Sequence, residues 1–216
     1  MQISKPILLG HRGARASRKI PENTLASFDL CLQHGCDGFE FDVRLSGDGQ
    51  ALICHDASVG GMKIANTASE SLVLPTLEGV LRQFAHRAFL DIELKVAGLE
   101  SQTLAELRKH PPQKGYVVSS FLPEVLAATY DLDPAIPLGF LCETAAQLRG
   151  WREATAQWVI PRFDLADREL VELVHTAGKR IMVWTVNRAE GMREFAAWGV
   201  DAIISDETEL LVRSLR

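Results

Sequence analysis

The chain has 216 residues and a formal net charge of −5, with 47% hydrophobic and 24% charged residues. This length and balance are typical of one folded α/β or barrel domain, and the acidic charge argues against a nucleic-acid-binding surface. No apolar run approaches the roughly 20 residues that cross a bilayer, and the first ten residues are too weakly apolar for a secretion signal. We therefore expect one domain over residues 1–216, in the cytoplasm and without a membrane span. The sequence leaves the oligomeric state open.

The cysteine pattern agrees with a reducing compartment. The four cysteines form no C-x-x-C pair and sit singly within apolar patterns: Cys31, Cys36, Cys54 and Cys142. Isolated cysteines of this kind behave as small buried residues. We expect free thiols, although spacing alone does not exclude a disulfide.

The first third of the chain alternates short apolar runs with helical patterns. Residues 7–11 predict a strand, and Asn23 or Thr24 begins a helix that ends at Gly35. A second strand follows at 38–43, and a shorter one at 51–54 comes after a glycine-rich turn. Residues 57–75 predict an irregular connection, after which Thr76 begins another helix.

The alternation of strand and helix continues to the C-terminus. We expect later helices at 124–130, 145–153, 167–177, 189–198 and 207–215. The main repeats give eight strands, at 7–11, 38–43, 89–95, 116–120, 137–141, 157–160, 180–186 and 202–205. Eight such units in about 200 residues favour a compact (β/α)8 TIM barrel, in the α/β class, over an open sheet. The glycine-rich nucleotide motif of the open-sheet alternative is missing from the sequence.

The second strand carries two acidic side chains. Glu40 and Asp42 alternate with Phe39, Phe41 and Val43. Because side chains of a strand switch faces at every residue, the two carboxylates point one way and the apolar side chains the other. Two neighbouring carboxylates repel each other, so this face calls for a positive partner, of which a bound cation is the simplest.

Polar side chains gather at the ends of several predicted strands. In a barrel these ends meet at one mouth, where they would collect His11, Arg12, Glu40, Asp42, His55, Glu93 and Lys95. The three carboxylates suit one Mg²⁺ or Ca²⁺ ion, and the arginine and lysine suit a phosphate. Histidines have pKa values near neutrality and suit a general acid and general base. Together these residues predict cleavage of a phosphoester.

Each residue also has a structural explanation when it is taken alone. A histidine at a strand end is commonly a hydrogen-bonded structural residue, and Glu93 can form a salt bridge with Lys95 inside a barrel, with Asp91 as a further partner. Trp184 either packs inside the barrel or forms an apolar wall at the mouth. The joint placement on three successive strand ends favours the functional interpretation.

These blocks closely resemble the glycerophosphodiester phosphodiesterase family. The resemblance rests on the order and spacing of seven motifs: His11-Arg12-Gly13, Pro21-Glu22-Asn23-Thr24, Glu40-Phe41-Asp42-Val43, His55-Asp56, Glu93-Leu94-Lys95, Val183-Trp184-Thr185-Val186-Asn187 and the run from Gly199 to Asp206. It is densest over residues 10–56 and 180–206, and it thins over 57–88 and 121–179.

The resemblance implies a metal-dependent barrel hydrolase that releases sn-glycerol 3-phosphate and an alcohol. By matching position, the three carboxylates would hold the ion, and His11 and His55 would be the acid and the base in an unassigned order. Arg12 and Lys95 would bind the phosphate, Glu22 would orient His11 or contact the metal shell, and Trp184 would line the glycerol end. In the family mechanism a neighbouring glycerol hydroxyl attacks phosphorus, and water then opens the cyclic phosphate.

One departure from the family pattern concerns the segment after the second strand. Residues 57–75 are short and lack the Arg-Thr-Thr segment that the family usually carries in a small subdomain over the mouth. Because the insertion is reduced, the sequence does not determine which alcohol group the protein would accept. Two alternatives follow: a lysophospholipase-D-like phosphodiesterase, and a barrel that binds a phosphorylated metabolite without turning it over.

Overall fold

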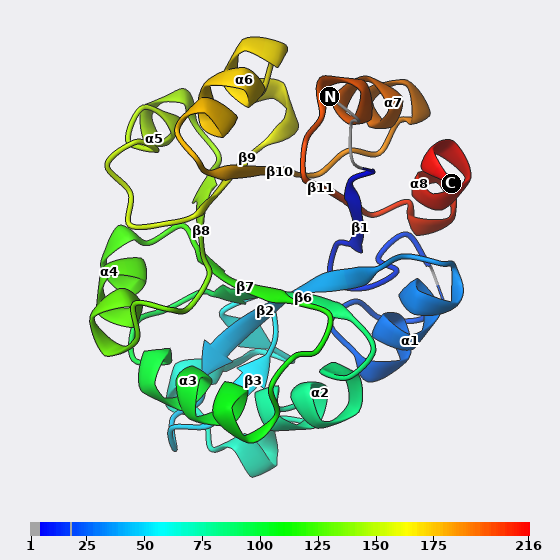
Figure 1. Ribbon diagram of the computed structural model, residues 1–216. Helices are drawn as coiled ribbons and strands as arrows, with labels where there is room; N and C mark the ends of the chain where they lie inside the picture. The colour runs from blue at the N-terminus through cyan, green and yellow to red at the C-terminus, as the bar shows by residue number, and fades with distance from the viewer. Residues whose placement is uncertain (1–4, 18) are drawn as a thin grey trace.

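A computed structural model describes residues 5–17 and 19–216. Within these ranges, eight parallel strands close into a barrel because β1 pairs with β11 on one side and with β2 on the other (Figure 1). Around the ring the strands are β1 (Ile7–Gly10), β2 (Gly38–Leu45), β6 (Phe89–Leu94), β7 (Tyr116–Ser120), β8 (Leu138–Cys142), β9 (Trp158–Pro161), β10 (Arg180–Val183) and β11 (Ala202–Ser205). The predicted (β/α)8 barrel is confirmed.

Helices form an outer ring around the strands (Figure 1). They are α1 (Leu25–Gln33), α2 (Leu77–Phe84), α3 (Glu100–Lys109), α4 (Pro123–Leu132), α5 (Ala145–Leu148), α6 (Arg168–Thr176), α7 (Ala189–Trp198) and α8 (Thr208–Leu215). Local sequence explains several of their starts. The hydroxyl of Thr24 accepts a hydrogen bond from the Ser27 amide, and that of Thr76 accepts one from the Gly79 amide. Each satisfies an amide that the helix itself leaves free.

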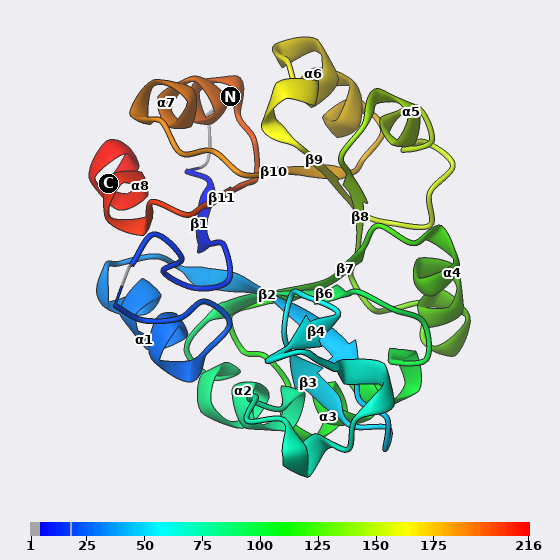
Figure 2. The same ribbon diagram turned by 180° about the vertical axis from the view of Figure 1, so that it is seen from behind.

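The segment between β2 and α2 forms a side structure next to the barrel. β3 (Ala51–Ile53) pairs antiparallel with the end of β2, which extends beyond the parallel register. A hairpin of β4 (Ser58–Val59) and β5 (Met62–Lys63) follows, with two 3₁₀ turns, η1 (Ile64–Asn66) and η2 (Ser69–Ser71). In Figure 2 this cyan-to-teal segment lies beside β2, β3 and α2. The connection expected to be irregular therefore has short elements of its own.

Two expected elements are shorter in the structure, and one helix has no counterpart among the expected helix ranges. The strand expected at 180–186 ends at Val183, because Trp184 makes only an isolated bridge to Arg162 before Val186 donates to the Ile204 carbonyl. The helix expected at 145–153 ends at Leu148, where the chain turns ahead of Gly150. Helix α3 is not among the expected helix ranges; its N-cap residue, Leu99, provides no side-chain hydrogen bond, and its sequence is mostly polar.

Outward-facing side chains of the strands pack against the helices. Phe39 and Phe41 of β2 lie against Phe28 of α1 and Phe84 of α2, and all four rings are fully buried. The rings of Phe28 and Phe39 stack with their centroids 4.2 Å apart. Aromatic side chains bury large apolar areas, so this cluster anchors the strand whose other face carries the acids.

Inward-facing side chains fill the lower part of the barrel. They form a separate apolar cluster of Leu9, Phe89, Val117, Leu141, Trp158, Ile160, Met182, Ala202 and Ile204. Close approach of the strands explains one glycine here, because a Cβ on Gly38 would lie 1.8 Å from the Phe89 carbonyl oxygen. The lower interior is therefore a packed core.

All four cysteines are free, and those at 31, 36 and 142 are buried, which confirms the expected free thiols. Over the described ranges, no helix has the length and apolar character that crossing a membrane requires.

The aromatic cluster yields a stability prediction. We expect Phe39→Ala to lower the free energy of unfolding by about 3–5 kcal/mol, because it opens a cavity between β2, α1 and α2. Phe163→Ala is the matched control, since that ring is 47% exposed, and it should change stability by less than about 1 kcal/mol. Urea denaturation followed by circular dichroism measures both. Equal effects of the two substitutions would contradict this account of the core.

Candidate active site

A polar cavity lies at the C-terminal ends of the strands. Its volume is about 350 Å³, and its walls are His11, Arg12, Glu40, His55, Glu93, Lys95, Phe121, Leu141, Glu143, Trp184 and Ile204. A larger space of about 490 Å³ lies between η3 (Phe163–Leu165) and α7. That space contains none of the predicted site residues, so the polar cavity is the candidate active site.

Alternation along the strands places these residues. In each strand the residues that continue the row of the apolar interior cluster face inward. At the mouth these rows end in His11, Asp42, Lys95, Phe121, Glu143, Arg162, Trp184 and Asp206. Every strand of the barrel thus delivers one polar or aromatic side chain to the rim.

Three carboxylates from two adjacent strands form the centre of the site. β2 and β6 are paired in a register that sets Asp42 beside Glu93 and Glu40 beside Asp91. Glu40, Asp42 and Glu93 are buried, and one oxygen from each lies within 4.8 Å of the others. Asp91 sits one layer lower and accepts a hydrogen bond of 2.6 Å from the Ser119 hydroxyl.

Burial and mutual repulsion shift the acidity of this cluster. Burial, together with the charges of Asp42 and Glu93, raises the pKa of Glu40 well above its ordinary value. Burial and the charge of Asp42 likewise raise the pKa of Glu93 to about 7. Burial also acts on Asp42, but Lys95 and Arg12 outweigh it and hold the pKa of Asp42 below its ordinary value. Burial and repulsion therefore oppose full ionisation of all three carboxylates, and further positive charge would favour it.

The carboxylate cluster fits a divalent cation. Oxygen Oε1 of Glu40 is buried and has no hydrogen-bond partner among the residues that the structure describes. An unpaired buried carboxylate oxygen is costly, and a hard cation with oxygen ligands would satisfy it. Both Mg²⁺ and Ca²⁺ have the required ligand preference.

Two cations flank the carboxylates. Nζ of Lys95 lies 2.6 Å from Glu93 and 3.2 Å from Asp42. The guanidinium of Arg12 lies 3.2 Å from Asp42. The backbone amide of Arg12 donates a 2.9 Å hydrogen bond to Glu40. Arg12 has a φ of 52°, an uncommon left-handed backbone that turns its amide and its side chain toward the same cluster.

The segment Pro21-Glu22-Asn23-Thr24 contacts both the basic and the acidic side chains of the site. Glu22 binds Arg12 at 2.7 Å and Arg15 at 2.6 Å, so it contacts the guanidinium groups and not His11. The amide of Asn23 donates a 2.8 Å hydrogen bond to Asp42. Thr24 is therefore the helix cap of the two candidates, while Asn23 belongs to the site.

His11 is held in one orientation by an aspartate. Nδ1 of His11 lies 2.7 Å from Oδ1 of Asp206, and Nε2 lies 3.9 Å from Glu40 inside the cavity. Asn187 donates a 2.7 Å hydrogen bond to the other oxygen of Asp206. Burial opposes ionisation of Asp206, but the hydrogen bond with His11 and the contacts of Asn187 and Arg15 hold its pKa below the ordinary value. An ionised Asp206 fixes the hydrogen on Nδ1 and leaves Nε2 as the free acceptor.

Burial lowers the pKa of His11, although Asp206 acts in the opposite direction. A neutral imidazole at physiological pH follows from this shift, and only a neutral imidazole can accept a proton.

His55 lies across the cavity in a different environment. Its side chain is 36% exposed, against 12% for His11, and its Nδ1 lies 2.8 Å from Asp56. The side chain of Arg44 donates a 2.7 Å hydrogen bond to the His55 carbonyl and fixes the backbone there. The cavity thus contains one buried and one accessible histidine, each paired with an aspartate.

The opposite wall of the cavity is aromatic and apolar. The indole of Trp184 donates a 3.0 Å hydrogen bond to the Ile160 carbonyl, and its ring packs edge-to-face with Phe121 at 5.6 Å. Leu141 and Ile204 form the floor below them. Trp184 therefore takes the second of its two expected places, as a wall at the mouth.

The structure brings all nine predicted site residues to this mouth, with Glu22 in contact through Arg12. It adds Asn23, Asp206, Phe121 and Glu143. Asn23 and Asp206 lie within motifs of the sequence. The available signal was their position, since Asn23 directly precedes the N-cap Thr24 of α1 and Asp206 directly follows the end of β11. Phe121 and Glu143 sit in segments without any motif, so only their place in the inward rows identifies them.

Comparison with known proteins agrees with this geometry. The model of the glycerophosphoryl diester phosphodiesterase family matches residues 11–110 and 64–210. A glycerophosphodiester phosphodiesterase of Caldanaerobacter subterraneus subsp. tengcongensis is 28% identical, over 98% of each chain.

Solved structures of similar sequence share the whole barrel. A phosphodiesterase of Oleispira antarctica, solved with the product sn-glycerol-3-phosphate, is 28% identical with a TM-score of 0.84, covering 97% of this chain and 96% of its own. A glycerophosphodiester phosphodiesterase of Thermotoga maritima is 26% identical with the same TM-score, covering 97% and 98%. Because the family model spans both the strands that carry Glu40, Asp42 and Glu93 and the C-terminal strands of the barrel, the chain belongs to the glycerophosphoryl diester phosphodiesterase family of enzymes.

Proposed function

We propose that this protein hydrolyses glycerophosphodiesters to sn-glycerol 3-phosphate and an alcohol, with the aid of one divalent cation. The observation that carries the proposal is the single cavity in which three buried carboxylates, two cations and two histidines meet. The Oleispira antarctica relative, which was solved with sn-glycerol-3-phosphate, supports the same product here.

Glu40, Asp42 and Glu93 would hold the cation, which when bound would polarise the phosphate oxygens and offset their charge. Arg12 and Lys95 stand on either side of these carboxylates and can bind the remaining phosphate oxygens. Glu22 keeps the fork of Arg12 in place through its 2.7 Å contact. The phosphorus would thus lie between His11 and His55, with the glycerol against Trp184.

The environments of the two histidines suggest separate roles. His11 has a free Nε2 inside the cavity and a lowered pKa, as a general base requires. It would take the proton of the attacking hydroxyl, which is the neighbouring glycerol hydroxyl in the first step. His55 is more accessible and would give a proton to the oxygen of the departing alcohol. Water would then open the cyclic phosphate with the two roles exchanged.

A product assay tests the activity directly. Purified protein with Mg²⁺ or Ca²⁺ should convert glycerophosphocholine into choline and sn-glycerol 3-phosphate, measured with glycerol-3-phosphate dehydrogenase. Excess EDTA should abolish turnover, and added Mg²⁺ or Ca²⁺ should restore it. The proposal fails if no glycerophosphodiester gives a metal-dependent product. Faster release from lysophosphatidylcholine would instead favour the lysophospholipase-D-like alternative.

The acidic cluster yields a prediction with a readout besides activity. Glu40→Gln should lower kcat/KM at least about 100-fold. In wild type, a hundredfold excess of Mg²⁺ or Ca²⁺ over its dissociation constant should raise Tm by about 5–10 °C, and this shift should disappear in the variant. In EDTA the variant should be no less stable than wild type, because it lacks one of three crowded carboxylates. An ion-induced Tm shift of wild-type size in the variant would contradict the assignment of Glu40.

The aspartate behind His11 yields a third prediction. Asp206→Asn should lower kcat about 10²- to 10⁴-fold, because the histidine loses the carboxylate that fixes its tautomer. Asp206 raises the pKa of His11, so its loss should move the acidic limb of the pH–rate profile to lower pH. Asp131→Asn, at an exposed position of α4, is the matched control. A lower kcat with an unmoved pH profile would show that Asp206 acts only on the fold.

A further inference from the structure

The rim of the cavity contains a glutamate that the proposed mechanism does not use. Glu143 follows the end of β8, two residues above the buried Leu141 in the same inward row. Its side chain is 58% exposed and lines the cavity. At about 3.3 Å per strand residue, this carboxylate stands above the apolar floor and at the opening.

The charge of Glu143 remains available to a ligand. Its salt bridge with Arg162 is long, at 3.9 Å. Arg162 directs its guanidinium to Asp164 instead, through two hydrogen bonds of 2.6 and 2.9 Å. Because a bidentate pair holds an arginine more strongly than a single long contact, Asp164 takes most of the arginine's charge. The other carboxylates that line the cavity, Glu40 and Glu93, belong to the proposed cation site.

An aromatic corner lies on the same side of the opening. Phe121 follows the end of β7, the strand paired with β8, and its ring is half-buried against Trp184. Nζ of Lys95 stands 5.7 Å from the centroid of Phe121. Aromatic faces with a nearby carboxylate attract ammonium groups, quaternary ones included.

The cavity is therefore divided into two halves. The half formed by β1, β2 and β6 contains the carboxylates, cations and His11, which suit the phosphate. The half formed by β7, β8, β10 and β11 offers an apolar floor and a rim of Phe121 and Glu143. A phosphodiester carries two organic groups, and the uncharged glycerol suits the floor at Trp184, Leu141 and Ile204.

We propose that Glu143 and Phe121 form a rim subsite that selects glycerophosphodiesters whose alcohol carries an ammonium group, such as choline or ethanolamine. This inference rests on the proposed function, since the rim matters only if the phosphodiester lies in the cavity. Glu143 supplies the opposite charge, and the ring of Phe121 supplies the aromatic contact. A neutral alcohol such as glycerol or inositol gains neither interaction.

The test compares kcat/KM for two cationic and two neutral substrates in the presence of Mg²⁺. We expect wild type to prefer glycerophosphocholine and glycerophosphoethanolamine over glycerophosphoglycerol and glycerophosphoinositol by about tenfold. Glu143→Gln should reduce this preference about fivefold. Phe121→Leu should reduce it about threefold, and more for choline than for ethanolamine.

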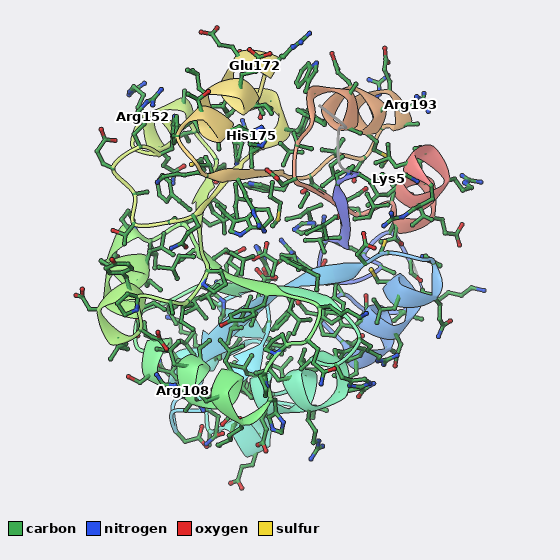
Figure 3. All side chains as sticks on the ribbon, in the orientation of Figure 1. Lys5, Arg108, Arg152, Glu172, His175 and Arg193 are labelled. Atoms are coloured by element: carbon green, nitrogen blue, oxygen red, sulfur yellow. The ribbon has the colours of Figure 1, made fainter. Side chains whose placement is uncertain are left out.

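Glu172→Gln is the matched control. Like Glu143, Glu172 is an exposed glutamate that contacts an arginine, at 3.0 Å, but it lies on α6 and points away from the barrel (Figure 3). Its substitution should leave the preference at the wild-type value. Equal kcat/KM for all four substrates in wild type, or an unchanged preference in Glu143→Gln, would overturn the inference while the hydrolase function stands. Turnover of none of the four would overturn the proposed function itself.

Discussion

The repulsion among three buried carboxylates is the constraint on which the site depends. Glu40, Asp42 and Glu93 lie within 4.8 Å of one another because β2 and β6 are adjacent and in register. Such a cluster is unfavourable unless positive charge compensates it, and Arg12 and Lys95 provide part of that charge. Burial, together with the repulsion that remains between the carboxylates, raises the pKa of Glu40 and Glu93. The fold tolerates this arrangement because the other face of β2 is anchored by a stacked phenylalanine cluster.

The same strand therefore combines stability with strain. Its outward residues contribute apolar burial, and its inward residues hold the groups that need a ligand. The loop after β1 adds the left-handed Arg12, whose amide and guanidinium both point to the acids. Asn23, also left-handed at a φ of 56°, closes the arrangement from the neighbouring loop through its bond to Asp42. Arg12 and Asn23, two non-glycine residues with an unfavourable left-handed backbone, thus both contact the carboxylate cluster.

The barrel can be predicted from the sequence because the period of the apolar residues and the spacing of the apolar runs indicate which segments are strands and which are helices. Eight apolar runs with helical segments between most of them identify a closed parallel sheet, and the confirmed strands differ only at their ends. Helix α3 is hard to predict because its sequence has neither a favourable N-cap residue nor a strong apolar stripe. The early end of β10 could not be read either, since Trp184, Thr185 and Val186 all have strand propensity. Tertiary context decided these positions.

Site residues were predictable where chemistry constrains several neighbours at once. A strand that presents carboxylates to a cation would alternate acidic with apolar residues, and a turn that binds phosphate would place a basic residue beside a histidine. The sequences at β1, β2 and β6 follow these patterns and are recognisable as motifs. On the opposite wall each strand contributes one inward residue, and nothing requires its neighbours to be of a particular type. Phe121 and Glu143 are of this kind. They become visible only once the closed ring shows that odd positions of β7 and β8 face the same cavity as His11. It follows that the residues shared by such a barrel can be recognised in local motifs, whereas the proposed selection of the alcohol would rest on single positions that only the three-dimensional structure brings together.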